Sequence, residues 1–405
     1  MANEYGDLVG SIKEKARALR DETARTLSEL VKTPSLSGEE QRVVELLGGM
    51  LDEAGFDRVY TDSLGNLIGV MGGSGPVLAF DAHIDTVDTG ERGQWELDPF
   101  SGAVSGGYVH GRGSVDQKGG AAALVTAGRM LKELGYEGPY ALYFTFTVME
   151  EDCDGLCWNY LIEREGLVPR FAVITEPTGL DVHRGQRGRM EIELSFSGLS
   201  AHGSAPERGD NAVYRAANAA LRIQELNGRL QSDDFLGKGS VAVTGILSNA
   251  PSLCAIPDRC MLHVDRRLTW GETREGALKE IEAIAGGEAD ISVPRYERKS
   301  YRGLSYPQEK FFPTWKLEEE HPLVLAGRRT HQLLEGKPPA VGKWTFSTNG
   351  VSICGTHGIP AIGYGPGDES LAHAPNERVP ITHLEIAAGF YTLLPWVLGD
   401  QDPGG

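Results

Sequence analysis

The strongest constraint on the fold is a repeated succession of short apolar runs and helix-like stretches in the first half of the chain. The runs VLAFDAHID, YALYFTFTV and RFAVITEP have the length of buried strands, and a stretch with helical spacing, AAALVTAGRMLKEL, lies between the first two. Strands that alternate with helices form a mostly parallel sheet with helices on both faces. Reactive groups in such a sheet collect at the carboxyl ends of the strands. We therefore expect an α/β fold with its site along one edge of the sheet.

Two helices are expected before the first of these strands. Apolar residues at helical spacing predict the first helix over residues 12–32. The segment SLSGEE then offers Ser37 as the N-cap of a second helix that continues through Leu51.

The pattern changes near residue 187. RMEIELSFSGLSAHG, SVAVTGILS and RCMLHVDRRL alternate polar and apolar residues like half-exposed strands, and NAVYRAANAALRIQEL is an amphipathic helix. Helix and strand patterns resume with HPLVLAGRRTHQLLEG and IPAIGYGPG. We therefore predict one domain made of residues 1–187 and 304–405, interrupted by a smaller α+β domain of residues 188–303.

Charge and apolar composition exclude several classes of function. The net charge of −18 disfavours nucleic acid as a partner, because binding a polyanion requires clustered Lys and Arg. No apolar run is long enough to span a membrane, and MANEYGDLVGSIKEK lacks the apolar core of a signal peptide. The five cysteines are an odd number without paired-ligand spacing, which favours reduced thiols. We expect a cytoplasmic protein with no nucleic-acid or membrane partner.

Acidic residues and histidines follow the expected strands. In VMEEDCDG, Glu150 and Glu151 are adjacent and point to opposite sides of an extended chain. A solvated acidic turn is the simplest interpretation of this segment taken alone. A solvated turn does not explain why a His or an acid follows one expected strand after another. These residues are His83, Asp116, Glu151, Glu176 and His373.

These residue types suit a pair of divalent metal ions. Two zinc ions about 3.5 to 4 Å apart, each with about three N or O ligands, can share one bridging carboxylate. Asp116 fits between the ions, and the other four residues would be divided between them. Glu150 is then left over as a general base. Asp85 lies two residues from His83, where a carboxylate can orient a ligand ring. Zinc is the expected metal, although such ligands also accept Co²⁺ or Mn²⁺.

The order of these motifs resembles a known family. HIDTV, GRGSVDQKGG, the EE pair, ITEPT, SAHGSAPERGDNA and AHAPNE occur in sequence over most of the chain. They are similar to the dinuclear zinc metallopeptidase family of carboxypeptidase G, succinyl-diaminopimelate desuccinylase, acetylornithine deacetylase and aminoacylase. EEDCDGLCW and DRRLTWGET also resemble its selenium-metabolism-linked hydrolase branch.

The resemblance implies specific roles for the metal-site residues. Asp116 would bridge the two ions, and Glu150 would be the catalytic base. Each ion would take one histidine and one glutamate: His83 with Glu176, and His373 with Glu151. Asp85 would stand behind His83.

The resemblance also gives roles to the inserted domain of residues 188–303. That domain would be a lid and dimerisation module, so a homodimer is expected. His202 would reach the partner subunit's active site and polarise the scissile carbonyl. Arg267 would grip a substrate carboxylate. Several relatives have an Asn where this chain has Cys254, and Asn249 could substitute for it as a substrate contact.

These observations predict a metal-dependent hydrolase that cleaves an amide bond of a small carboxylate-bearing substrate. Glu150 would take a proton from water, and the resulting metal-bridging hydroxide would attack the carbonyl. An N-acyl amino acid, an N-carbamoyl amino acid and a dipeptide remain open as substrates. One alternative keeps the metals but cleaves an ester or cyclic amide. Another is a non-catalytic member that binds a ligand through a metal-containing site.

Overall fold

The computed structural model describes residues 5–401 and contains one large sheet. This nine-stranded sheet has the order β1-β2-β6-β3-β7-β20-β8-β18, with β19 paired to β8. Its strands are β1 (Arg58–Thr61), β2 (Leu67–Met71), β3 (Val77–His83), β6 (Ala141–Thr147), β7 (Phe171–Ile174), β8 (Val182–Gln186), β18 (Trp315–Lys316), β19 (Val341–Trp344) and β20 (Ala361–Gly363).

The centre of the large sheet is parallel and buried. β3 pairs in parallel with both β6 and β7, and β20 pairs in parallel with β7. Nearly every residue of these strands is buried, as expected for apolar strands covered on both faces. The register places His83 opposite Thr147. The residues that follow these strands therefore emerge at the same edge of the sheet.

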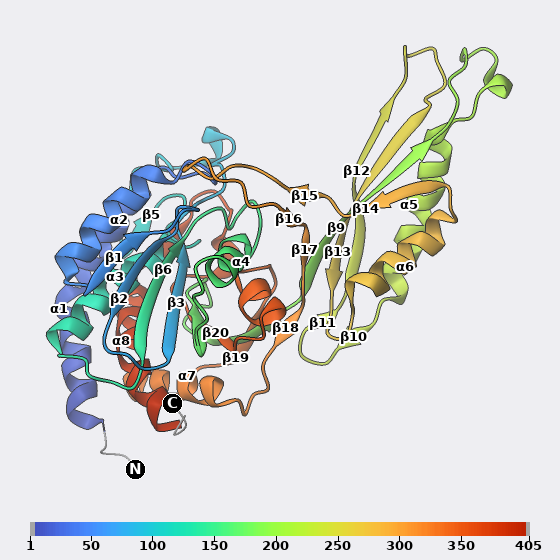
Figure 1. Ribbon diagram of the computed structural model, residues 1–405. Helices are drawn as coiled ribbons and strands as arrows, with labels where there is room; N and C mark the ends of the chain where they lie inside the picture. Colours follow the sequence, from blue (N-terminus) through green and yellow to red (C-terminus); the bar gives the residue numbers. More distant parts are fainter. Residues whose placement is uncertain (1–4, 402–405) are drawn as a thin grey trace.

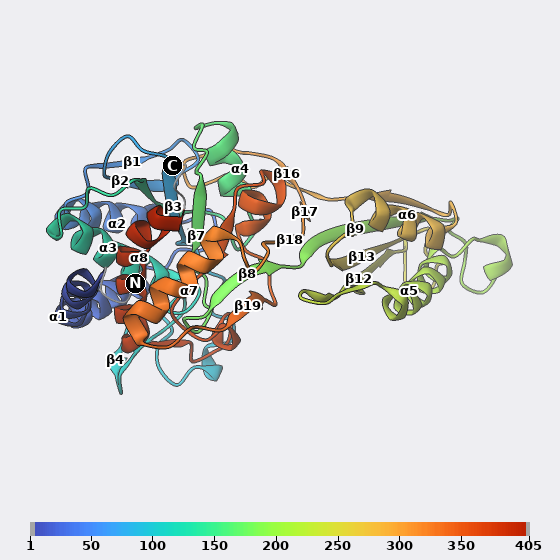
Figure 2. The same cartoon turned by 90° about the horizontal axis from the view of Figure 1, so that it is seen from below.

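Helices cover both faces of the large sheet. α4 (Leu156–Glu163) lies on one side in Figure 2, and α1 (Gly6–Val31), α3 (Lys118–Glu133), α7 (Pro322–Glu335) and α8 (Ile381–Gln401) lie on the other. α2 (Gln41–Ala54) packs against α3 and β2. The expected α/β class with a mostly parallel sheet is confirmed.

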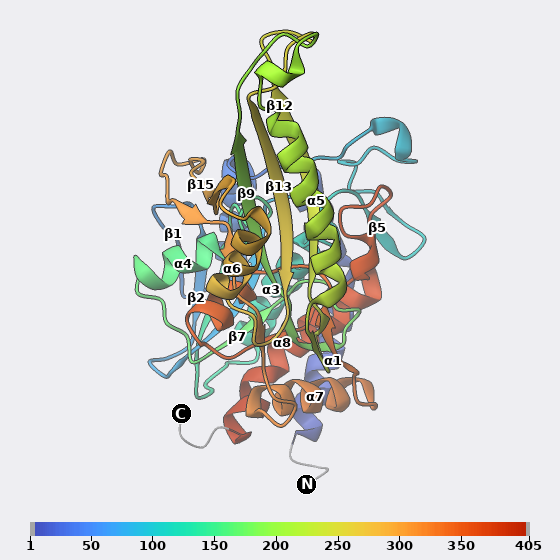
Figure 3. The same cartoon turned by 90° about the vertical axis from the view of Figure 1, so that its right-hand side faces the viewer.

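A second, antiparallel sheet projects from the large one (Figure 1). It has five strands: β9 (Gly188–Ser197), β12 (Ser240–Asn249), β13 (Arg259–Leu268), β14 (Ala289–Ser292) and β17 (Phe311–Phe312). The alternate residues of β9 and β13 that are buried pack against α5 (Ala212–Arg229) and α6 (Arg274–Ala285) in a separate apolar cluster. These helices cover one face of the small sheet (Figure 3), on the side away from the large sheet. The domain limits 1–187, 188–303 and 304–405 stay a prediction.

Two adjacent strand segments connect the sheets. The outgoing chain passes from β8 to β9 between Gln186 and Gly188, and the returning chain passes from β17 to β18. Trp315 pairs with Gln186 in the large sheet, and Phe312 pairs with Arg189 in the small one. The two crossings therefore lie side by side as a narrow ribbon.

The remaining elements are short. They are the strands β4 (Val104–Ser105), β5 (Tyr108–His110), β10 (Ser232–Asp233), β11 (Gly237–Lys238), β15 (Arg295–Tyr296), β16 (Gln308–Glu309) and β21 (Arg378–Pro380), and the helical turns Arg92–Gln94, Pro206–Arg208, Val351–Thr356 and Glu369–Leu371.

The prediction for the start of the second helix is wrong. α2 begins after Glu40, and no side chain caps its first turn. The Ser37 hydroxyl instead donates to Asp85 Oδ2 at 2.6 Å, so this loop supports the site edge of the sheet. Because α2 starts three residues later than predicted, Ser37 is not at the N-cap, and its buried hydroxyl pairs with the Asp85 carboxylate.

α8 is long and apolar enough to span a membrane by length and composition. However, 67% of its most apolar window is buried inside the protein, where it packs against α1, α3 and α7. A core helix of a folded domain has the same composition, and this packing accounts for the apolar character of α8.

Candidate metal centre

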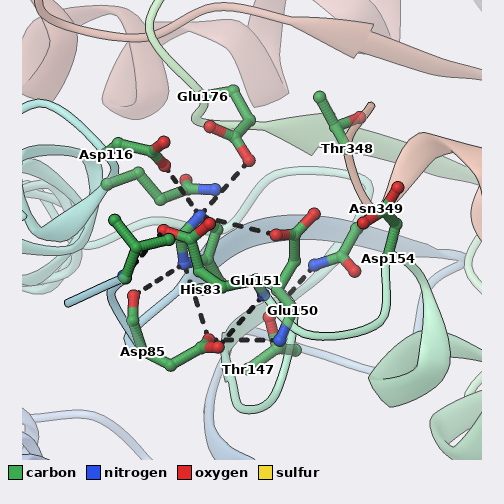
Figure 4. Close-up of polar contacts among 12 residues, drawn as sticks. His83, Asp85, Asp116, Thr147, Glu150, Glu151, Asp154, Glu176, Thr348 and Asn349 are labelled. Atoms are coloured by element: carbon green, nitrogen blue, oxygen red, sulfur yellow. Dashed lines mark hydrogen bonds and ion pairs between the residues drawn. The ribbon is translucent and has the colours of Figure 1, made fainter. Parts of the chain in front are cut away.

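The predicted site residues meet at the carboxyl edge of the central strands. His83 ends β3, the pair Glu150 and Glu151 follows β6, and Glu176 follows β7. Asp116 lies just before α3. The close-up in Figure 4 shows these side chains pointing toward one another, which is the convergence expected from a parallel sheet.

His83 faces several carboxylates with one ring nitrogen. Its Nε2 lies 2.9 Å from Asp116 Oδ1, 3.4 Å from Glu176 Oε1 and 3.9 Å from Glu150 Oε2. The ring is almost fully buried. A single nitrogen cannot hydrogen-bond three carboxylates, so the arrangement suits a cation placed among them.

Asp116 spans two histidines. While its Oδ1 faces His83, its Oδ2 lies 3.2 Å from His373 Nε2. The same His373 nitrogen is 2.9 Å from Glu151 Oε2. One carboxylate oxygen is thus directed to each half of the cluster, as a carboxylate bridging two ions requires.

Asp85 supports the site through the backbone as well as the His83 ring. His83 Nδ1 lies 3.0 Å from the main-chain oxygen of Asp85 and 3.6 Å from its carboxylate. The carboxylate accepts the backbone N–H groups of Glu150 at 3.2 Å and Glu151 at 3.1 Å. It therefore fixes the position of the glutamate pair, a role that sequence spacing did not indicate.

Glu377 is a second support that the sequence analysis missed as a functional residue. Its carboxylate accepts hydrogen bonds from Arg112 Nη1 at 2.7 Å and from the backbone N–H groups of Gly113, Val115 and Asp116 at 2.7 to 3.1 Å. It holds the loop that presents the Asp116 carboxylate. The motif AHAPNE contains Glu377, but nothing in the motif reveals these contacts.

Asn349 holds the loop after β6 in a similar way. Its side-chain amide donates to Asp81 Oδ2 at 2.9 Å and accepts the Gly155 N–H at 3.0 Å. We found no sequence pattern that singles out this asparagine.

The electrostatics of the cluster call for positive charge. Burial and nearby Asp116 raise the pKa of Glu151 to about 7 and that of Glu176 to about 8. Hydrogen bonds to Asp116 and Glu151 raise the pKa of His373 to about 10. Burial raises the pKa of Glu150 well above its ordinary value. Several acids share one low-dielectric pocket, and the rings of His83 and His373 lie among them.

The residues fit a divalent metal. Among residues 5–401, Glu150 Oε1 and Glu176 Oε2 are buried without a hydrogen-bond partner. Potential ligand atoms lie within 4.8 Å of one another in two groups that share His83, one with Glu150 and Glu176 and one with Asp116 and Glu151. Imidazole and carboxylate ligands suit zinc, manganese or cobalt.

A cavity of about 340 Å³ opens beside the cluster. Its lining includes the metal-site acids, His373 and Arg267. The Arg267 guanidinium donates to the Asp265 carboxylate at 2.8 Å, which holds the guanidinium in place. The structure therefore brings Arg267 to the site.

His202 and Asn249 lie elsewhere in this chain. The His202 ring is exposed and takes hydrogen bonds from Ser204. Asn249 ends β12 and lines a separate depression with Ser197 and Arg259. Cys254 is exposed in the following loop. Both loops lie at the end of the small sheet that points away from the large sheet (Figure 1).

Comparisons with known proteins agree on one family. The model of peptidase family M20/M25/M40 matches residues 79–395. The Escherichia coli (strain K12) protein YgeY is 50% identical over 387 residues, covering 95% of this chain and 96% of that protein. The succinyl-diaminopimelate desuccinylase of Cereibacter sphaeroides (strain ATCC 17025 / ATH 2.4.3) is 31% identical over 388 residues. The match covers 90% of this chain and 95% of that protein.

Solved structures share the fold. The Bacillus subtilis YXEP protein, described as a dinuclear metal-binding peptidase from the M20 family, superposes with a TM-score of 0.71. The alignment covers 96% of this chain and 99% of that chain at 16% identity.

Proposed function

Because the chain belongs to peptidase family M20/M25/M40, we propose that it cleaves an amide bond in a small substrate that carries a carboxylate. The chain is an enzyme, a metallohydrolase of the peptide and acyl-amino-acid class. The finer proposal is that the substrate is an N-acyl amino acid, an N-carbamoyl amino acid or a dipeptide.

The observation that carries this proposal is the position of Glu150. Its carboxylate is buried within the metal-site cluster, 3.9 Å from His83 Nε2, and one of its oxygens has no partner among residues 5–401. Five other residues provide enough imidazole and carboxylate groups to hold the metals. A buried acid beside a complete ligand set is available for proton transfer.

The residues of the chain have distinct roles in the proposed reaction. Divalent metals at His83, Asp116, Glu151, Glu176 and His373 supply Lewis acidity and lower the pKa of water when bound. Glu150 accepts the proton of the water that attacks the amide carbonyl. As the carbon–nitrogen bond breaks, Glu150 delivers that proton to the leaving amine.

Other residues bind and orient the substrate. Arg267 on β13 is proposed to bind the substrate carboxylate, because its guanidinium lines the same cavity. His202 is proposed to donate to the developing oxyanion from a second subunit, because it is remote from the cavity of its own chain. Asn249 or Cys254 would enter the site by the same route.

Zinc, a homodimer and a cytoplasmic location complete the proposal. The mixed ligands suit Zn²⁺, with Co²⁺ or Mn²⁺ as alternatives. Exposed apolar residues at the remote end of the small sheet, among them Leu199, Leu247 and Leu253, support contact with a second copy. All five cysteines are unpaired, which supports a reducing compartment.

The test compares metal content and hydrolysis in the wild type, Glu150→Gln and a control, Glu275→Gln, which alters an exposed glutamate of α6. The substrates are N-acetyl, N-succinyl and N-carbamoyl amino acids and dipeptides. We expect about two metals per chain in all three proteins. Turnover should be lost only in Glu150→Gln.

Other results would change the proposal. Two bound metals without hydrolysis of any substrate by the wild type would favour a non-catalytic binding protein or cleavage of an ester or cyclic amide. Failure to bind metal would refute the ligand assignment.

A further inference from the structure

The lining of the cavity beyond the metal-site residues combines charges of both signs. Arg189 on β9 and Arg267 on β13 are directly paired across the small sheet, so their side chains share a face. Both line the cavity, together with Asp154 from the loop after β6. The proposed reaction assigns a role to Arg267 but leaves Arg189 and Asp154 without one.

Asp154 is buried and incompletely paired. The residue is only 4% exposed, and its Oδ2 has no hydrogen-bond partner among residues 5–401. Its Oδ1 lies 3.6 Å from Arg189 Nη2, which is beyond hydrogen-bond distance. A buried carboxylate with an unused oxygen is costly and calls for an explanation.

Arg189 does not fully compensate this charge. Its Nη2 is also 3.6 Å from Glu191 Oε1, an acid that Lys310 and His263 contact more closely, so Arg189 is within hydrogen-bond distance of neither acid. Its Nε has no hydrogen-bond partner among the residues that the structure describes. The negative charge at Asp154 therefore remains available to a cation that enters the cavity.

The backbone holds Asp154 where it is. Gln308 Nε2 donates to the Asp154 main-chain oxygen at 3.1 Å, and the next residue, Gly155, donates its N–H to Asn349. The Asp154 carboxylate does not cap α4, whose N-cap is Gly155 without a side-chain hydrogen bond. These contacts keep the carboxylate in the cavity wall instead of in solvent.

We propose that Asp154 recognises a protonated amino group on the substrate, an inference that rests on the proposed amide hydrolysis. Figure 4 shows Asp154 on the far side of Glu150 from His83. An ammonium group bound there would lie beside Glu150, and the substrate carboxylate would lie toward Arg267. The preferred substrate is thus an amide that carries both a carboxylate and an ammonium group.

Two kinds of substrate offer this ammonium group. One is a dipeptide, through its free α-amine, and the other is an N-acylated diamino acid, through its side-chain amine. An N-acyl amino acid without a second amine would leave the Asp154 carboxylate buried and unpaired, which disfavours its binding.

The experiment uses pairs of amides that differ only by the ammonium group. Alanyl-alanine is compared with propanoyl-alanine, and Nα-acetyl-lysine with Nα-acetyl-norleucine. kcat/KM is measured in the wild type and in Asp154→Asn. Binding is measured by calorimetry in metal-loaded Glu150→Gln, with and without Asp154→Asn, so that affinity is known whether or not turnover occurs.

We expect the ammonium member of at least one pair to be preferred by about tenfold or more, and Asp154→Asn to reduce that ratio by about tenfold. The pair that shows the effect identifies the α-amine or the side-chain amine. Asp152→Asn is the matched control, because Asp152 lies on the same loop but pairs with Tyr296 and Arg298 outside the cavity. It should leave the ratio unchanged.

Several outcomes would overturn the assignment. One is equal affinity of the protein with Asp154 for the two amides of each pair. Another is a preference for the ammonium-bearing amide that persists in Asp154→Asn. A third is an equal loss of kcat/KM for both amides of a pair in Asp154→Asn. Glu369 also lines the cavity. If Glu369→Gln loses the preference for the ammonium-bearing amide and Asp154→Asn keeps it, Glu369 and not Asp154 binds the ammonium group. If Asp154→Asn does not fold, Asp154→Ser is measured in the same way. If the ammonium-bearing amides bind more tightly but are not cleaved by the wild type, the proposed amide hydrolysis is refuted and the recognition of ammonium by Asp154 stands.

Discussion

Replacement of Glu377 by Gln should weaken both the fold and the metal site. One carboxylate oxygen accepts the N–H groups of Val115 and Asp116, and the other accepts Gly113 N–H and Arg112 Nη1. A Gln can accept on one side only, so its NH₂ group must face two donors. The Glu377–Arg112 pair is almost fully buried, and removal of one partner of such a pair costs about 3 to 5 kcal/mol.

The metal affinity should fall as well, because the same hydrogen bonds position Asp116. Loss of a supporting contact of this kind lowers metal affinity by about 10- to 100-fold. Urea unfolding of the chelator-treated protein measures the stability, and competition with a chelating dye measures the affinity.

Glu385→Gln is the matched control for Glu377→Gln. It removes a partly exposed acid that lies 3.8 Å from Arg20, and it should cost less than about 1 kcal/mol. A loss below about 1 kcal/mol for Glu377→Gln, with unchanged metal affinity, would refute the assigned role of Glu377.

Three further predictions concern stability, metal and assembly. Burial, with a further contribution from Asp85, raises the pKa of Glu40 from 4.5 to about 8. Between these values the folded state holds a proton that the unfolded state has released, so stability falls with rising pH by up to about 1.4 kcal/mol per unit. Urea titrations should show that Glu40→Gln gains stability relative to the wild type from about pH 5 to about pH 8; a constant difference would contradict this pKa. Metal removal should lower the melting temperature in calorimetry, and restored metal at 100 times its Kd should add about 2.7 kcal/mol; equal melting temperatures would argue against a metal site in the folded state. Remixed subunits of His202→Ala and Glu150→Gln should regain about a quarter of wild-type activity, because half of the random dimers contain one intact site; no recovery in confirmed mixed dimers would exclude donation of His202 by the partner.

The large sheet could be predicted because its central strands are unusually regular. β3, β6 and β7 are mostly apolar, and burial on both faces leaves few alternatives to a parallel sheet. β8 and α4 were not predicted. β8 contains the polar segment HRGQ and is buried by Trp315 and Trp344, which are distant in sequence. α4 has only eight residues, too few for a clear helical period.

Convergence of the metal-site residues could be predicted for the same geometric reason. His83 and the residues after Thr147 must emerge at one edge once their strands are paired in parallel. Supporting contacts could not be predicted, since Glu377 reaches Asp116 across 261 residues of sequence. Ser37 shows the same limit: its surroundings indicate a helix cap, but a carboxylate 48 residues away takes its hydroxyl.

The ribbon between the two sheets places the whole small sheet in one insertion of the chain. Gln186 and Trp315 are directly paired, so the chain leaves and re-enters the large sheet one strand spacing apart, about 5 Å. A two-residue turn can close such a gap. Excision of residues 187–314 and closure with a tight turn would leave the order of the large sheet intact, but it would also remove Tyr301 and Tyr306, whose hydroxyls donate to Gly65 and Glu163 beside that sheet. The chain therefore carries residues 187–314 as a hairpin carries its loop, and no strand of the large sheet lies within them.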